Sequence, residues 1–174
     1  FNDPNTITVK SDLLRKFIAF MIVASRKNEA KGNYAKLGGK SPLVGYTKAL
    51  ITKVQAQLPD TYVTFAMRYT PPFAKDAIEE LKTHGIKEVF VLPLYPQYST
   101  TTTKSSLEDF YEALEASGLK IQTKDITRFY QDGGYNSVLV QRIHETLGDL
   151  DPKEYDLIFS AHSLPQKIVD NGDP

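Results

Sequence analysis

The sequence predicts an α/β fold, a three-layer, doubly wound parallel sheet. Apolar segments of strand length alternate with amphipathic segments of helix length, and glycine or proline residues separate them. This alternation is typical of βαβ units, in which a helix connects two parallel strands. There is no linker, repeat or low-complexity segment, so residues 1–174 are expected to form one α/β domain.

Helices are predicted where capping residues precede an apolar period of about 3.6 residues. Ser11 and Asp12 begin a helix that Gly38-Gly39 end, and Ser41-Pro42 begin a second that Pro59-Asp60 close. Further helices are expected from Pro71-Pro72 to Gly85, from about Ser105 to Ser117, and from about Asn136 to Leu147.

Strands are predicted at 61–69, 86–94, 119–126 and 155–161. The segment 86–94 is almost continuously apolar, which is typical of a strand buried on both faces. Ligands of such sheets bind beyond the carboxyl ends of the strands. That rule selects three places, Arg68-Tyr69, the loop 95–103 and His162-Ser163.

Composition narrows the classes of function. Lysine plus arginine (21) equals aspartate plus glutamate (21), so no basic excess indicates a nucleic-acid partner. The absence of cysteine excludes disulfides, thiolate zinc sites and cysteine nucleophiles within these residues. Residues 1–4 show no signal-peptide pattern, and the expected location is the cytoplasm.

The apolar run Phe17–Ala24 is followed by the basic pair Arg26-Lys27. Eight residues are too few to cross a bilayer, which takes about 20 in a helix. An apolar surface that ends in cations suits an amphipathic ligand with carboxylates, or peripheral contact with an anionic inner membrane. The alternative is a helix that faces the core and has a solvated end.

His162 follows the predicted strand 155–161 directly. An imidazole at a ligand-binding edge can accept a proton near neutral pH or bind a metal through a neutral nitrogen. The alternative is a structural histidine bonded to a backbone carbonyl. The loop Tyr95–Thr103 combines two tyrosines, an amide and hydroxyls, which suits a flat aromatic ligand with polar edges, or simply caps the next helix.

Taken together, these segments resemble the ferrochelatase family. The most specific are Ser160–Pro165 with Gly172-Asp173-Pro174 behind it, and Tyr95–Ser99. Gly38–Pro42 and Arg68-Tyr69 support them, and the resemblance runs along nearly the whole chain from Phe1-Asn2-Asp3 onward. Four such segments in the family's order and spacing make a specific match.

The resemblance implies two similar α/β halves that enclose a porphyrin and insert ferrous iron into it, the terminal step of haem biosynthesis. His162 matches the active-site histidine that faces the pyrrole nitrogens, either as proton acceptor or in metal delivery. The porphyrin-binding positions that the resemblance implies are Tyr95, Arg26, Ser41, Arg68 and Tyr34. Ferrous iron is then a substrate, and no other cofactor, including an iron–sulfur cluster, is indicated in this stretch.

Two departures from the family pattern are expected to matter. The family's first strand is missing, and so is its C-terminal half, which carries an acidic residue opposite the histidine. Residues 1–174 are therefore interpreted as the N-terminal half of a two-domain enzyme, inactive by itself.

Alternatives remain within and outside this chemistry. A coproporphyrin ferrochelatase or a cobalt chelatase would use similar residues, and Gln97 mildly favours protoporphyrin because coproporphyrin users often have histidine there. From another class, a porphyrin carrier would bind the ligand without metallating it, and a two-lobed solute receptor would normally be exported.

Overall fold

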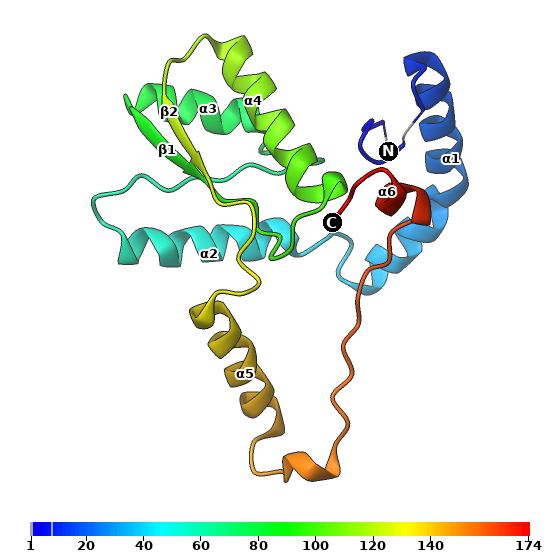
Figure 1. Ribbon diagram of the computed structural model, residues 1–174, viewed down its shortest axis with the longest axis vertical. Coiled ribbons are helices and arrows are strands. Elements are labelled where there is room, and N and C mark those ends of the chain that lie inside the picture. The colour runs from blue at the N-terminus through cyan, green and yellow to red at the C-terminus, as the bar shows by residue number, and fades with distance from the viewer. Residues whose placement is uncertain (1, 8) are drawn as a thin grey trace.

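The computed structural model describes residues 2–7 and 9–174 (Figure 1). In chain order the elements are α1 (Asp12–Lys36), α2 (Leu43–Gln57), α3 (Ala74–Thr83), β1 (Glu88–Val91), the π-helical turn η1 (Thr100–Lys104), α4 (Ser105–Ser117), β2 (Gln122–Asp125), α5 (Gly133–Leu147), the 3₁₀ turn η2 (Pro152–Glu154) and α6 (Gln166–Asp170). Each predicted helix is confirmed, and α6 is an addition to them.

Local capping explains where the helices begin and end. The Ser11 hydroxyl accepts a hydrogen bond from the Leu14 N–H (3.4 Å) at the start of α1. The Asp132 carboxylate accepts one from the Tyr135 N–H (2.8 Å), which starts α5 three residues before the apolar pattern does. Gly118 ends α4 with φ at +66°, a conformation that glycine adopts without steric cost.

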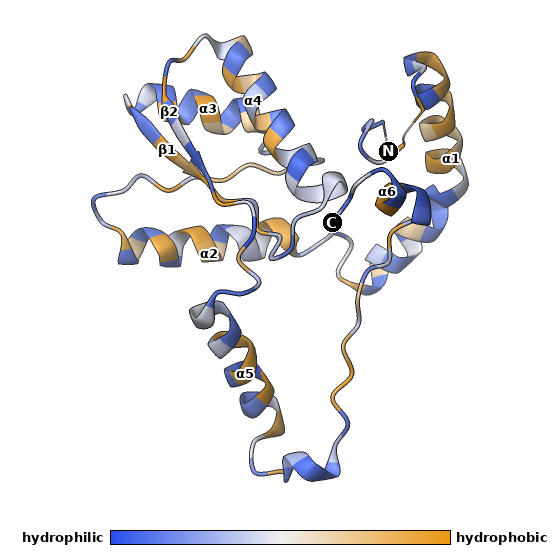
Figure 2. Ribbon diagram, viewed as in Figure 1, coloured by the Kyte–Doolittle hydropathy of each residue, from blue (hydrophilic) through white to orange (hydrophobic). Residues whose placement is uncertain are grey.

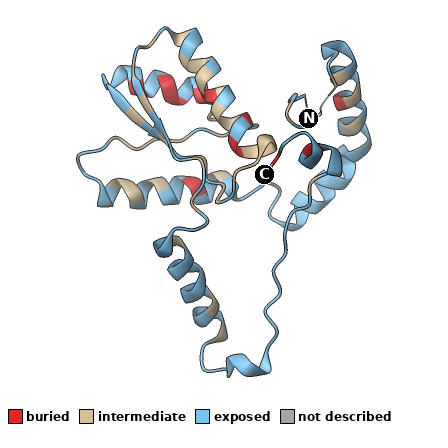
Figure 3. Cartoon of the chain, viewed as in Figure 1, coloured by how far each residue is buried: buried red, intermediate tan, exposed pale blue. Residues whose placement is uncertain are grey.

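The core lies between helices α3 and α4 and one face of a small parallel sheet. Strands β1 and β2 pair in parallel, with Val89 opposite Thr123. Ile78 is fully buried together with Ala74 and Phe110, and Val89 and Val91 pack against this cluster from the sheet. In Figure 3 most of the buried chain lies on helices α3 and α4. The alternation of side chains along β1 therefore directs its valines to the helices.

The outer face of the sheet is open in the part of the chain that the structure describes. Phe90 is 62% exposed, and Leu92 and Leu94 are also exposed. The prediction that 86–94 is buried on both faces is therefore wrong for these residues, because no further layer covers that face here. The molecule is a helix-rich α/β structure with a small parallel sheet, and a three-layer sheet stays a prediction.

Two predicted strands, 61–69 and 155–161, are not strands in the structure. A strand forms only when its backbone groups pair with a neighbour, and these segments run as irregular chain. Residues 155–165 return from η2 as a long extended segment (Figure 2), with Ile158 87% and Phe159 81% exposed. The apolar side chains of 155–161 are therefore exposed, because no other described residues pack against them.

Candidate functional site

The last part of α1 lines a shallow hollow of about 520 Å³. Arg26, Ala30 and Tyr34 recur at four-residue spacing, so the helix presents them on one face. Lys27 and Lys31 add positive charge to the rim. The structure therefore brings together two of the predicted site residues, Arg26 and Tyr34, in a hollow that suits an anionic ligand with an aromatic body.

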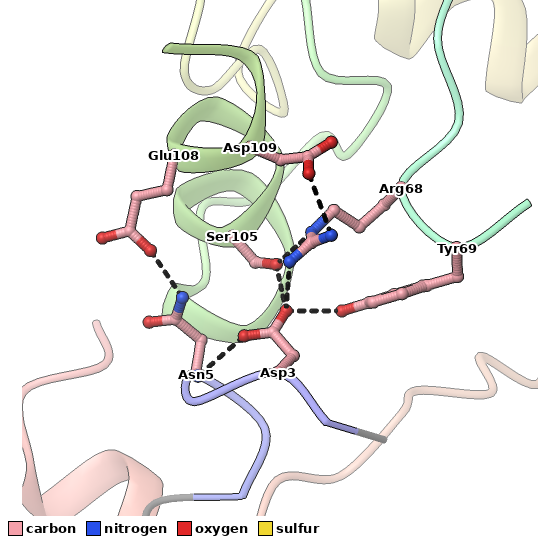
Figure 4. A network of polar contacts seen from close by, with 7 residues as sticks. All are labelled: Asp3, Asn5, Arg68, Tyr69, Ser105, Glu108 and Asp109. Carbon is pink, nitrogen blue, oxygen red and sulfur yellow. Dashed lines mark hydrogen bonds and ion pairs between the residues drawn. The ribbon is translucent and has the colours of Figure 1, made fainter. Parts of the chain in front are cut away.

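A second constellation surrounds the carboxylate of Asp3, which is 4% exposed (Figure 4). Its Oδ2 accepts hydrogen bonds from the Ser105 hydroxyl, from the Tyr69 hydroxyl (2.8 Å) and from Arg68 Nη2 (3.3 Å). Its Oδ1 accepts one from the Asn5 backbone N–H (2.8 Å). Burial raises the pKa of Asp3, but the Ser105 hydrogen bond and the others outweigh it and leave the pKa below its usual value.

Arg68 is held on three sides by this network. Besides Asp3, its Nε donates to Ser105 Oγ (2.9 Å) and its Nη1 to Asp109 Oδ1 (3.1 Å). The guanidinium also lies over the Tyr69 ring, 5.0 Å from its centre. With two carboxylates against it, the charge of Arg68 is already compensated within the protein.

A third constellation centres on Asp173, which is 6% exposed. Its Oδ2 accepts hydrogen bonds from Ser99 Oγ (2.8 Å), from the Thr100 N–H (2.6 Å) and from Thr100 Oγ1 (2.6 Å). Burial raises the pKa of Asp173, and the Thr100 and Ser99 bonds lower it further than burial raises it. Two segments far apart in sequence, 95–100 and 172–174, are thereby joined.

The remaining predicted site residues lie outside these three constellations. His162 is exposed in the extended segment before α6, and Tyr95 is half-buried four residues after β1. The Ser41 hydroxyl accepts a hydrogen bond from the Leu43 N–H (3.3 Å) at the start of α2, two residues from Gly39 on the wall of the hollow. The described residues hold no group of three or more histidine, aspartate or glutamate side chains placed to bind a metal.

Comparison with known proteins supplies the family. The model of the Ferrochelatase family matches residues 1–174. The chain belongs to the ferrochelatase family. It is 60% identical over 174 residues to a protein of Nitratiruptor sp. named Ferrochelatase, covering all of this chain and 56% of that protein.

Other ferrochelatase relatives show the same pattern. Proteins so named from Wolinella succinogenes and Sulfurimonas denitrificans are 48% and 49% identical, covering 100% and 99% of this chain and 55% of each relative. The chain therefore spans about half the length of the curated relatives it matches. Within residues 2–7 and 9–174, no helix combines the length and apolarity needed to cross a membrane.

Sequence reasoning missed two carboxylates of this ferrochelatase-family chain. Asp3 and Asp173 both lie in segments on which the resemblance was based, Phe1-Asn2-Asp3 and Gly172-Asp173-Pro174. Phe1 itself lies outside the described residues. Neither was assigned a role, because an isolated aspartate in a turn has no helical or strand spacing that identifies its partner. Only their burial and their distant hydrogen-bond donors reveal them.

Proposed function

We propose that this chain contributes one half of an enzyme that inserts ferrous iron into protoporphyrin IX to form protohaem, the terminal step of haem biosynthesis. The observation that carries the proposal is the match of all 174 residues to the ferrochelatase family. The relatives that bear this name are about twice as long, so the isolated chain is expected to be inactive.

The hollow on α1 supports the porphyrin part of the proposal. A porphyrin is a flat aromatic ring with carboxylate side chains, and the hollow offers Tyr34 beside Arg26, Lys27 and Lys31. A guanidinium binds a carboxylate in a bidentate manner, and a tyrosine ring packs on an aromatic face. Ser41 and Tyr95 are proposed to add polar contacts to the same ligand.

His162 is proposed as the catalytic residue. Metallation releases two protons from the inner nitrogens as the metal dication enters, so the products are one metalloporphyrin and two protons. A neutral imidazole accepts each proton in turn and passes it to water, which its exposed position allows. The imidazole nitrogen of His162 that accepts the proton is, when unprotonated, also a suitable transient ligand for the incoming iron. Bending the macrocycle exposes the nitrogen lone pairs at a cost of about 1–5 kcal/mol.

Arg68 is proposed to affect porphyrin binding indirectly, by ordering the residues around it. Because Asp3 and Asp109 already compensate its charge, its contribution is to hold Tyr69 and the start of α4 in place. Direct pairing with a porphyrin carboxylate would require it to leave these partners.

The finer architecture is also proposed. The half-buried segment 61–69 and the exposed segment 155–161 suit additional parallel strands of a three-layer, doubly wound sheet in one α/β domain, completed by chain beyond the residues present here. Phe17, Phe20 and Met21 on α1 are 53–67% exposed next to Arg26 and Lys27, which supports peripheral contact with an anionic membrane by a cytoplasmic enzyme. The reaction needs no redox cofactor, because the iron enters and remains ferrous.

The decisive experiment uses a chimera in which this chain replaces the matching segment of the Nitratiruptor relative. Protoporphyrin and ferrous iron or zinc are added anaerobically, and the porphyrin absorption bands are followed. The parent should metallate the porphyrin, and His162→Ala should lower the rate by about 10²–10⁴-fold. His144→Ala, which changes an exposed histidine on α5, is the matched control and should behave as the parent.

Three results would contradict parts of the proposal. A chimera that binds porphyrin and never metallates it would be a carrier. Faster metallation of coproporphyrin than of protoporphyrin would identify a coproporphyrin ferrochelatase, and faster insertion of cobalt than of iron would identify a cobalt chelatase. A normal rate for His162→Ala would remove the histidine from the mechanism while leaving the chelatase activity in place.

A further inference from the structure

Asp173 connects two parts of the chain that the proposed reaction must bring together. Its carboxylate accepts hydrogen bonds from Ser99 and Thr100, which lie at the start of η1 within the loop 95–103 that carries Tyr95. Asp173 itself lies eleven residues after His162, beyond the short helix α6. The contact therefore links the segment of the catalytic histidine to the loop of a porphyrin-binding tyrosine.

The backbone at Asp173 is held by hydrogen bonds within its own segment. The N–H of Gly172 donates to the Val169 carbonyl (2.9 Å), and the N–H of Asp173 donates to the Ile168 carbonyl (3.3 Å). Gly172 has φ at +96°, which a residue with a Cβ rarely adopts. Ile168 is 7% exposed, so α6 also buries an apolar side chain. The carboxylate is thus presented from a hydrogen-bonded turn.

The contact does more than cap a helix. The Ser99 hydroxyl already accepts from the Thr101 N–H (3.1 Å) at the start of η1, which is the usual local cap. Asp173 accepts from the preceding N–H, that of Thr100, and from two hydroxyls. Because the local cap comes from the loop itself, the particular effect of Asp173 is to tie in a segment more than 70 residues away.

We propose that Asp173 is a positioning residue that holds the His162 segment against the Tyr95 loop and so sets where His162 stands relative to bound porphyrin. The proposal rests on the proposed function. Hydrogen bonds to a charged carboxylate are short and directional, and they restrain a segment more tightly than apolar contact does. Asp173 touches no reacting atom and acts through His162.

The positioning role predicts a specific kinetic pattern. A displacement of about 1 Å in a reacting group can lower a rate by about 10²-fold. Asp173→Ala removes all three hydrogen bonds, so its kcat should fall by at least about tenfold. Since His162 acts on porphyrin that is already bound, KM for porphyrin should change much less than kcat. Asp173→Asn keeps an oxygen acceptor without the charge, and its kcat should lie between the two.

The test is made in the same full-length chimera, with kcat expressed per folded molecule from circular dichroism. Asp170→Ala is the matched control, because it removes an exposed aspartate three residues away whose hydrogen bond stays within α6, to Gln166 (2.9 Å). Thr100→Val removes one hydroxyl donor to Asp173 and keeps the N–H. It should lower kcat several-fold, and its effect should largely vanish in the Asp173→Ala background.

The outcomes separate this proposal from the function on which it rests. A kcat for Asp173→Ala equal to that of Asp170→Ala, in an active chimera, overturns the positioning role alone. So does a pure rise in KM, or additive effects of Thr100→Val and Asp173→Ala. If Asp173→Ala does not fold, the kcat of Thr100→Val decides the matter, and a parental value overturns the proposal. A parent that never metallates porphyrin overturns both the function and the positioning role.

Discussion

Replacing Asp3 with alanine is expected to destabilise the chain far more than its place beside an N-terminal turn suggests. The carboxylate is 4% exposed and accepts bonds from Ser105, Tyr69, Arg68 and the Asn5 N–H. Once it is removed, those donors face a small apolar side chain. The loss is therefore set by how many of them water can reach.

The magnitude follows donor by donor. Ser105 is 1% exposed, and a buried hydroxyl that loses its acceptor costs about 1–3 kcal/mol. Tyr69 is 60% exposed, so water can replace its partner at little cost. The Arg68 side chain is 24% exposed and keeps its ion pair with Asp109. Loss of the Arg68–Asp3 pair therefore costs less than the roughly 3–5 kcal/mol typical of a broken buried ion pair. The expected loss is about 3 kcal/mol of unfolding free energy.

Urea unfolding followed by circular dichroism measures this loss, and Asp12→Ala is the control. Asp12 also pairs with two cations, Arg15 and Lys16, but its side chain is 56% exposed, and exposed pairs contribute little. Asp3→Ala should lower the midpoint strongly, and Asp12→Ala should hardly change it. Equal midpoints for the two variants would refute the argument from burial.

The contribution of Asp3 to the unfolding free energy should depend on pH in a defined direction. The pKa of Asp3 is lower in the folded state, so its ionised form stabilises the fold at pH values above the unfolded pKa, about 3.9 for aspartate. The difference between the parent and Asp3→Ala should be constant above about pH 5 and should shrink as the pH falls through the folded pKa. A difference that grows on acidification would contradict the assignment.

Two further substitutions test the core and a buried hydroxyl. Ile78→Ala removes a side chain that is 0% exposed between α3, α4 and the sheet, and should cost about 2–5 kcal/mol, whereas Ile158→Ala, at an 87% exposed position, should cost almost nothing in the same urea experiment. Thr103 is 0% exposed, and its hydroxyl has no hydrogen-bond partner among the described residues, so Thr103→Val should leave the unfolding free energy unchanged or raise it by about 1 kcal/mol. A clear loss of stability in Thr103→Val would mean that the hydroxyl is satisfied.

The helices could be predicted from the sequence because their signals are local. Ser11 lies one residue before α1, and Gly118 one residue after α4, so cap and helix are neighbours in the chain. The segments 61–69 and 155–161 carry equally clear apolar patterns. A strand, however, needs a partner that its own sequence does not identify, and in the described residues these segments have none.

The same distinction applies to the candidate site. Arg26 and Tyr34 are eight residues apart on one helix, so their common face followed from the helix prediction alone. Asp3 and Ser105 are 102 residues apart, and Asp173 and Ser99 are 74 apart. No periodicity connects such pairs, so their contacts emerge only from the structure.

The long-range contacts of Asp3 and Asp173 fix both ends of the chain to its middle, which the small core does not do. The cluster of Ala74, Ile78 and Phe110 fixes α3 and α4 on the sheet but reaches neither end of the chain. Apolar contact is non-directional and tolerates sliding, whereas a hydrogen bond weakens steeply when its angle or length changes. Asp3 and Asp173 place such bonds at the start of the same helical run, η1 followed by α4. Arg68-Tyr69 and the segment that follows His162 are therefore both fixed to η1 and α4, and a change at either carboxylate should shift residues of the proposed site more than residues of the core.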